Sequence, residues 1–129
     1  TFWIGTYYGG VNLFNPDYEI YTYYYSDESQ QGKLTSPFAG RMKEDSKGNI
    51  WIATEGGGVN YLDRKTRSFA EFKHDINKNS LASNTVQSLH LDEENQTLWV
   101  GTLRGGLDKL DLKTHQFTNY RHIPGKRIR

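Results

Sequence analysis

The sequence predicts an all-β fold: a segment of a β-propeller with roughly two and three-quarter four-stranded antiparallel blades. Three observations predict it. The 129-residue chain repeats itself with a period of 48 residues, since Trp3, Trp51 and Trp99 are evenly spaced. Each period divides into short stretches rich in aromatic and β-branched residues, separated by Gly, Asn, Asp and Lys. No stretch has the periodicity of a helix.

The repeat is clearest in one motif. A shift of 48 residues places FWIGTYYGGVNLF (2–14) on IWIATEGGGVNYL (50–62) and on LWVGTLRGGLDKL (98–110). We expect the motif residues to build the scaffold, because tryptophans bury large surfaces between blades and glycines allow positive φ and close approach of backbones. These structural residues are Trp3, Trp51, Trp99, Gly9, Gly10, Gly57, Gly58, Gly105 and Gly106.

The strands follow from the same pattern. In the last repeat we expect strands at 86–91, 98–102, 106–110 and 116–121. The whole chain then holds eleven strands: a partial blade at 1–25 with strands two to four, complete blades at 38–73 and 86–121, and a linker to a further blade at 122–129. Bulky residues on both faces of the strands are typical of sheets packed between two others, as in a propeller.

Composition and motifs argue against several functions. The net charge is +1, there is no cysteine, and no apolar run approaches the roughly 20 residues of a membrane helix. We therefore expect neither nucleic-acid binding nor membrane insertion by this segment. His74, His90, His115 and His122 show no short metal-ligand spacing, so we expect no metal, cofactor or catalytic residue. Carboxylates from different blades could still meet, which leaves a propeller hydrolase or lyase as an alternative.

The motif W-[IV]-[GA]-T-x-x-G-G-[VL]-[ND], preceded by EDSKGNI (44–50) and followed by NSLASNTVQSL (79–89), resembles the two-component regulator propeller repeat. The resemblance implies the periplasmic sensor region of hybrid two-component sensor histidine kinases, common in Bacteroides. It implies an oligosaccharide ligand, the remaining propeller blades as partners, and phosphorelay signalling to transcription. The kinase activity would belong to the parent protein, and this segment would not be an enzyme.

A candidate ligand site comes from the positions where the repeats differ. In a meander, the turn between strands two and three lies at the same end as the crossover to the next blade. At that turn the three copies carry different pairs of residues, and variable residues on one rim are free to recognise a ligand. We expect Tyr7, Tyr8, Glu55 and Arg104 to bind it, because rings stack on sugars and charged groups bind hydroxyls.

Four smaller expectations complete the sequence analysis. Asp45 and Asp92 should hold turns through backbone amides, and the polar segment 26–36 should be a mobile rim loop. The tyrosine cluster should pack on the neighbouring blade; its members are Tyr18, Tyr21, Tyr23, Tyr24 and Tyr25. Bare blade faces at both ends should make the isolated chain associate with itself, and a protein-interaction or dimerisation platform is an alternative function.

Overall fold

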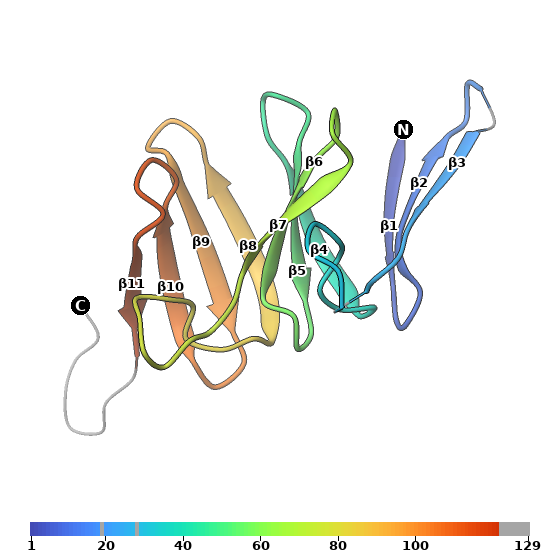
Figure 1. The fold of residues 1–129 in the computed structure, drawn as a ribbon. Helices are drawn as coiled ribbons and strands as arrows, with labels where there is room; N and C mark the ends of the chain where they lie inside the picture. Colours follow the sequence, from blue (N-terminus) through green and yellow to red (C-terminus); the bar gives the residue numbers. More distant parts are fainter. Residues whose placement is uncertain (19, 28, 122–129) are drawn as a thin grey trace.

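The computed structural model describes residues 1–18, 20–27 and 29–121, and the predicted linker at 122–129 lies outside them. The described residues form eleven strands in three antiparallel sheets (Figure 1). The first sheet holds β1 (Phe2–Thr6), β2 (Gly10–Asn15) and β3 (Ile20–Tyr24). The second holds β4 (Ala39–Glu44), β5 (Ile50–Thr54), β6 (Val59–Asp63) and β7 (Ser68–Phe72). The third holds β8 (Val86–Asp92), β9 (Thr97–Thr102), β10 (Gly106–Asp111) and β11 (Phe117–Tyr120).

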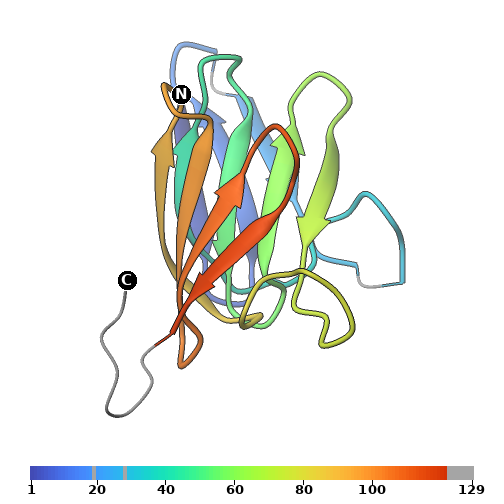
Figure 2. The ribbon, with the colours of Figure 1, turned by 90° about the vertical axis from the view of Figure 1, so that its left-hand side faces the viewer.

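Each sheet is a simple meander, and the three sheets stack face to face (Figure 2). The first strands of the complete sheets, β4 and β8, lie against each other, and β1 lies against β4. The all-β propeller class is therefore confirmed, and the strands predicted in the last repeat agree with β8 to β11 within one residue at each end. Among the described residues there is no helix with the length and apolar character needed to cross a membrane.

Strand β5 shows why the sequence hardly alternates. All five of its residues are buried, because both faces of the second sheet are covered. Ile50 and Ile52 belong to the core between the first and second sheets. Trp51 and Ala53 belong to the core between the second and third sheets. The two cores hold the three sheets together.

The three motif tryptophans have different surroundings. Trp51 is only 5% exposed and lies between the second and third sheets. Trp3 is half-buried and packs at the edge of the core between the first and second sheets, against Tyr24. Trp99 differs from the expectation of burial between blades. Its neighbours Leu98 and Val100 face the second sheet, so the half-buried Trp99 lies on the opposite face of the third sheet, which no other sheet of the described chain covers.

The T-x-x-G-G part of the motif builds the turn between strands two and three of each blade. The hydroxyl of Thr54 donates a 2.7 Å hydrogen bond to the carbonyl oxygen of Gly58, and Thr6 and Thr102 make the same bond to Gly10 and Gly106. Gly58 has φ +72°, and a Cβ there would collide with the carbonyl oxygen of Phe72 on the next strand. The second glycine therefore serves both the backbone conformation and the close approach of strand four.

The turns between strands one and two are held by carboxylates, as predicted. Asp45 Oδ1 accepts hydrogen bonds from the backbone amides of Lys47 and Asn49. Asp92 accepts hydrogen bonds from the side chain and the backbone amide of Asn95. The hydrogen bond from the Asn95 side chain, and then the one from its backbone amide, hold the pKa of Asp92 below its usual range.

Two expectations about the first repeat are wrong in part. Tyr24 does pack on the neighbouring sheet, edge-on to Phe69, but Tyr18, Tyr23 and Tyr25 are exposed. The segment 26–36 is not a mobile loop throughout, because its last three residues, Leu34, Thr35 and Ser36, are buried. Leu34 packs in the core between the first two sheets, a position that the polar composition of the segment did not predict.

Replacing Gly58 with Ala should destabilise the chain more than replacing Gly56 with Ala. Both glycines have positive φ, so each substitution costs about 1–2 kcal/mol from the backbone conformation. A Cβ at Gly56 has no neighbouring atom within 4 Å, whereas the Cβ at Gly58 also forces a backbone shift that costs about 1–3 kcal/mol. Urea unfolding measures both losses, and equal losses would contradict this account of the motif.

Candidate functional site

The candidate site lies on the rim formed by the two-to-three turns and the crossovers between blades, at the lower edge of Figure 1. Backbone hydrogen bonds join the two sets of loops. The amide of Glu55 donates to the carbonyl of Phe38 at 3.0 Å, and the amide of Leu103 donates to that of Thr85 at 2.9 Å. The prediction that these loops share one end of the blades is therefore confirmed.

Three of the four predicted residues lie around one aromatic side chain. The ring of Phe38 is 4.7 Å from that of Tyr7 and 5.4 Å from that of Tyr8, centroid to centroid. Tyr7 and Tyr8 are 81% and 73% exposed. Tyr7, Phe38 and Glu55 line a cavity of about 230 Å³, whose other walls are Ala39, Gly40 and Val86. The turn of the first blade, the crossover and the turn of the second blade thus meet at this cavity.

Arg104 lies apart from that group. It lines an open hollow of about 550 Å³ with Leu103, Ser83 and Thr85. Thr85 is next in sequence to Val86, which lines the first cavity, so the two hollows adjoin through the crossover into the third blade. A ligand that contacts Arg104 as well as the tyrosines would have to extend along the rim.

Two of the predicted residues occupy a conformation that disfavours side chains. Tyr8 and Arg104 have φ of 75° and 61°, and the equivalent residue of the second blade is Gly56, with φ of 88°. A tyrosine in the left-handed region is uncommon and costs backbone strain. Glycine would remove this strain. Placing a ring and a guanidinium at the tips of these turns therefore lowers the stability of the fold.

The sequence analysis missed Phe38, the centre of the aromatic group. Phe38 precedes strand β4 and lies outside the repeated motif, and the equivalent position in the next repeat is Val86. The same comparison between repeats that singled out Tyr7 and Tyr8 would have found it. This rim position, like the turn positions, differs between repeats: it is Phe in one and Val in the next.

The last motif position, Asn or Asp, anchors the crossovers that carry the rim. Asn60 is fully buried. Its side-chain oxygen accepts a 3.1 Å hydrogen bond from the amide of Thr35, and its side-chain nitrogen donates one of 2.6 Å to the hydroxyl oxygen of Thr35. In the next blade the buried Asp108 accepts hydrogen bonds from the backbone amide of Ala82 at 2.8 Å and from the Asn119 side chain at 2.7 Å. These contacts fix the crossovers against strand three of each blade.

The rim carries side chains that can contact a ligand. It offers two exposed rings, the carboxylate of Glu55 and the guanidinium of Arg104. Within the described ranges, no three His, Cys, Asp or Glu side chains are placed to hold a metal ion. The arrangement can stack on a flat ligand face and exchange hydrogen bonds with hydroxyl groups.

Replacing Asp108 with Asn should destabilise the third blade. Asp108 receives one hydrogen bond at each carboxylate oxygen, and an amide can accept at only one of these positions. One of the two part-buried donors would then face an amide nitrogen in place of an oxygen, at a cost of about 1–3 kcal/mol in the free energy of unfolding. The exposed Glu94→Gln is the matched charge-removing control, with a change within about 0.5 kcal/mol. Similar unfolding curves for the two variants would rule out the anchoring role.

Comparisons with known proteins agree with this architecture. Residues 33–56 and 80–104 match the family model described as Two component regulator propeller. Each matched segment covers the end of a crossover, strands one and two, and the start of the rim turn. A search of curated proteins finds no match.

Solved structures with the same fold come from B. thetaiotaomicron. The extracellular domain of the hybrid two component system BT3049 superposes with a TM-score of 0.79 at 22% identity, over 93% of this chain and 16% of that chain. The extracellular domain of the hybrid two component system BT4673 superposes with a TM-score of 0.62 at 23% identity, over 97% of this chain and 15% of that chain. This chain thus spans about a sixth of those structures. Two segments of this chain match the two component regulator propeller model, and the chain is folded as blades of a β-propeller.

Proposed function

We propose that the chain is a ligand-sensing propeller segment of an extracytoplasmic, periplasmic receptor for two-component signalling, and that its rim binds an oligosaccharide. The observation that carries this proposal is the group of exposed rings Tyr7 and Tyr8 on Phe38, beside the cavity lined by Glu55. The repeats of the regulator family support the signalling context.

The rim suits a sugar for physical reasons. A pyranose has apolar C–H faces that pack on aromatic rings and a circumference of hydroxyl groups that need hydrogen-bond partners. Tyr7 and Tyr8 supply the rings, and Glu55 supplies an acceptor at the cavity. Arg104, in the adjoining hollow, would reach only a ligand of several units.

Titration of the chain with plant and host oligosaccharides, from monosaccharides to longer oligomers, tests the proposal. We expect saturable binding without turnover, because a sensor holds its ligand and releases it unchanged. Each of the substitutions Tyr7→Ala, Tyr8→Ala and Glu55→Ala should weaken binding by about tenfold. That factor corresponds to the free energy of one stacking contact or one charged hydrogen bond. Replacing Arg104 with Ala should weaken only the longer oligomers. Calorimetry measures the affinities, and chromatography of the sugar detects any product.

The exposed Tyr18→Ala is the control for loss of an aromatic ring away from the rim. Product formation would favour the hydrolase or lyase alternative. Unchanged affinity in all four rim variants would refute the site.

The end faces of the sheet stack favour a second candidate function, a platform for association with another copy of the chain. Phe2 and Ile4, on the outer face of the first sheet, are 58% and 42% exposed. Leu107 pairs with Gly101 and so lies on the same outer face of the third sheet as Trp99; it is 42% exposed. By the 48-residue repeat, Phe2 and Ile4 correspond to Leu98 and Val100, which pack on Trp51 inside the chain. One copy's first sheet therefore has the side chains to cover another copy's third sheet.

Such head-to-tail contact predicts a concentration-dependent increase in mass, measured by light scattering. Ile4→Lys and Leu107→Lys should each abolish the increase, because each places a charge in one half of the contact. A mixture of the two variants should form a heterodimer, since one intact face remains on each. A stable monomer of the unsubstituted chain at high concentration would eliminate this candidate.

A further inference from the structure

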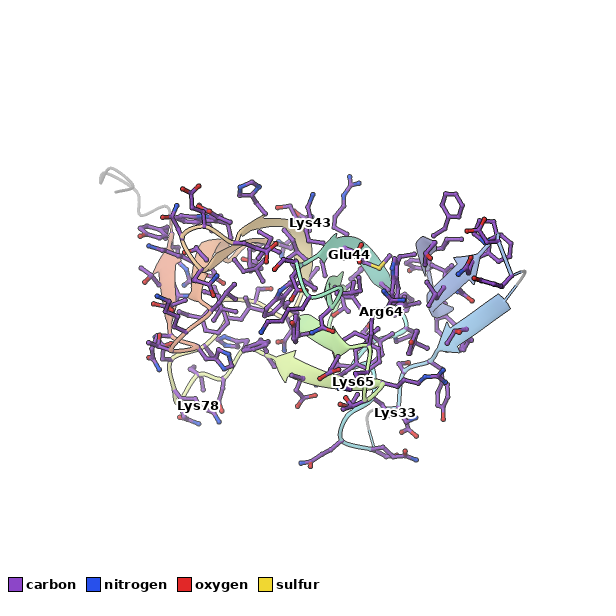
Figure 3. The ribbon with its side chains drawn as sticks, turned by 90° about the horizontal axis from the view of Figure 1, so that it is seen from above. Lys33, Lys43, Glu44, Arg64, Lys65 and Lys78 are labelled. Carbon is purple, nitrogen blue, oxygen red and sulfur yellow. The ribbon has the colours of Figure 1, made fainter. Side chains whose placement is uncertain are left out.

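The repeat allows the surroundings of equivalent tryptophans to be compared, and two of the three carry a cation over the ring. The guanidinium carbon of Arg64 lies 5.2 Å from the ring centroid of Trp3. Arg64 reaches that ring from the second blade (Figure 3). Its Nη1 lies 4.0 Å from Oε1 of Glu44. The ammonium nitrogen of Lys109 lies 5.7 Å from the ring centroid of Trp99.

Trp51 is the exception: among the described residues, no Lys or Arg lies over its ring. The residue 48 positions after Arg64 is Leu112, and the residue 48 positions before Lys109 is Tyr61. Both places from which a side-chain cation covers the other tryptophans therefore hold neutral residues around Trp51.

A cavity is present where the cation is missing. It has a volume of about 320 Å³ and lies between the second and third sheets, near the turns that join strands one and two. These turns are at the opposite end of the blades from the rim (Figure 1). Trp51, Tyr61 and Phe72 line it; the Trp51 centroid is 4.4 Å from that of Tyr61 and 5.6 Å from that of Phe72. The volume is at the lower end of the range of small-molecule sites, about 300–1,000 Å³.

Two carboxylates, one from each blade, also line this cavity. Asp45 accepts hydrogen bonds from two backbone amides and from the hydroxyl of Tyr61. Glu93 Oε2 accepts hydrogen bonds from the amide and the hydroxyl of Ser46, at 3.0 and 2.7 Å. All these donors are neutral, and the ion pairs among the described residues involve neither carboxylate. The two negative charges at the cavity are thus held in place without being neutralised by a direct ion pair.

The other groups at the cavity do not replace the missing cation. Burial, and then the hydrogen bond to Asp45, raise the pKa of Tyr61 to about 12, so its side chain is uncharged near pH 7. Lys47 also lines the cavity and is exposed, and among the described residues its ammonium lies over no ring. His115 contacts Phe72 edge-on from the third blade.

We propose that this inter-blade cavity is a binding site for an organic ammonium ion, whose charge occupies over Trp51 the place that Arg64 occupies over Trp3. Aromatic faces attract a desolvated cation through their quadrupole, and the carboxylates of Asp45 and Glu93 add a direct charge attraction. The site is separate from the rim and does not depend on the proposed sugar binding.

Choline, with its trimethylammonium group, is the probe for this site. The full chain is titrated with choline and, in parallel, with the neutral alcohol in which a tert-butyl group replaces trimethylammonium. The indole N–H signals of the three tryptophans are followed by NMR and assigned with Trp3→Phe and Trp99→Phe. We expect saturable movement of the Trp51 signal with choline and at least about tenfold weaker binding of the alcohol. Equal binding of the two compounds, or no movement of the Trp51 signal, would overturn the proposal.

Substitutions at the two equivalent positions give an independent test. Leu112→Arg should install over Trp51 the cation seen over Trp3 and weaken choline binding by about tenfold or more, whereas Leu112→Met should not. Lys47→Gln removes a like charge and should tighten binding. If Leu112→Arg fails to fold, Arg64→Leu remains informative, because it should uncover Trp3 and make its indole signal respond to choline as well. Choline affinity unchanged by Leu112→Arg, or a Trp3 signal that stays unresponsive in Arg64→Leu, would contradict a site defined by the missing cation.

Discussion

The structure depends on the packing of each sheet against the next. Strand β5 has Ile50 and Ile52 on one face and Trp51 and Ala53 on the other, and each pair belongs to a separate core. A four-stranded sheet alone leaves most of its apolar surface in water, so its stability comes from apolar surface shared with its neighbours. The same packing aligns the turns of successive blades and so places residues of different repeats, such as Tyr7 and Glu55, at one cavity.

The repeated motif works as a set of backbone constraints on which variable side chains are placed. The threonine and second glycine close each two-to-three turn, and the Asn or Asp that follows anchors the preceding crossover. None of these contacts uses the side chain at the tip of the turn, so that side chain can differ between blades. Variation can then concentrate at Tyr8, Gly56 and Arg104, which share one backbone conformation but carry different chemistry.

The fold could be predicted from the sequence because a propeller repeats its physical requirements. The strands predicted in the last repeat were correct, and so was the meeting of the two-to-three turns with the crossovers. Features set by three-dimensional neighbours could not be read in the same way. Leu34 lies in a polar segment and yet enters the core, and Arg104 shares the turn position of Tyr8 but lines a different hollow. The cavity at Trp51 depends on the residue one full repeat after Arg64, a correspondence whose meaning appears only once the blades are stacked.

The direct hydrogen bond from the amide of Glu55 to the carbonyl of Phe38 has a mechanical consequence. The cavity beside it has walls from the first blade, from the crossover and from the second blade, so an occupant touches both blades at once. Any rotation of one blade against the other changes the shape of that cavity. Binding at the proposed site and the orientation of the two blades would therefore be coupled, because a ligand that fits one orientation better favours that orientation.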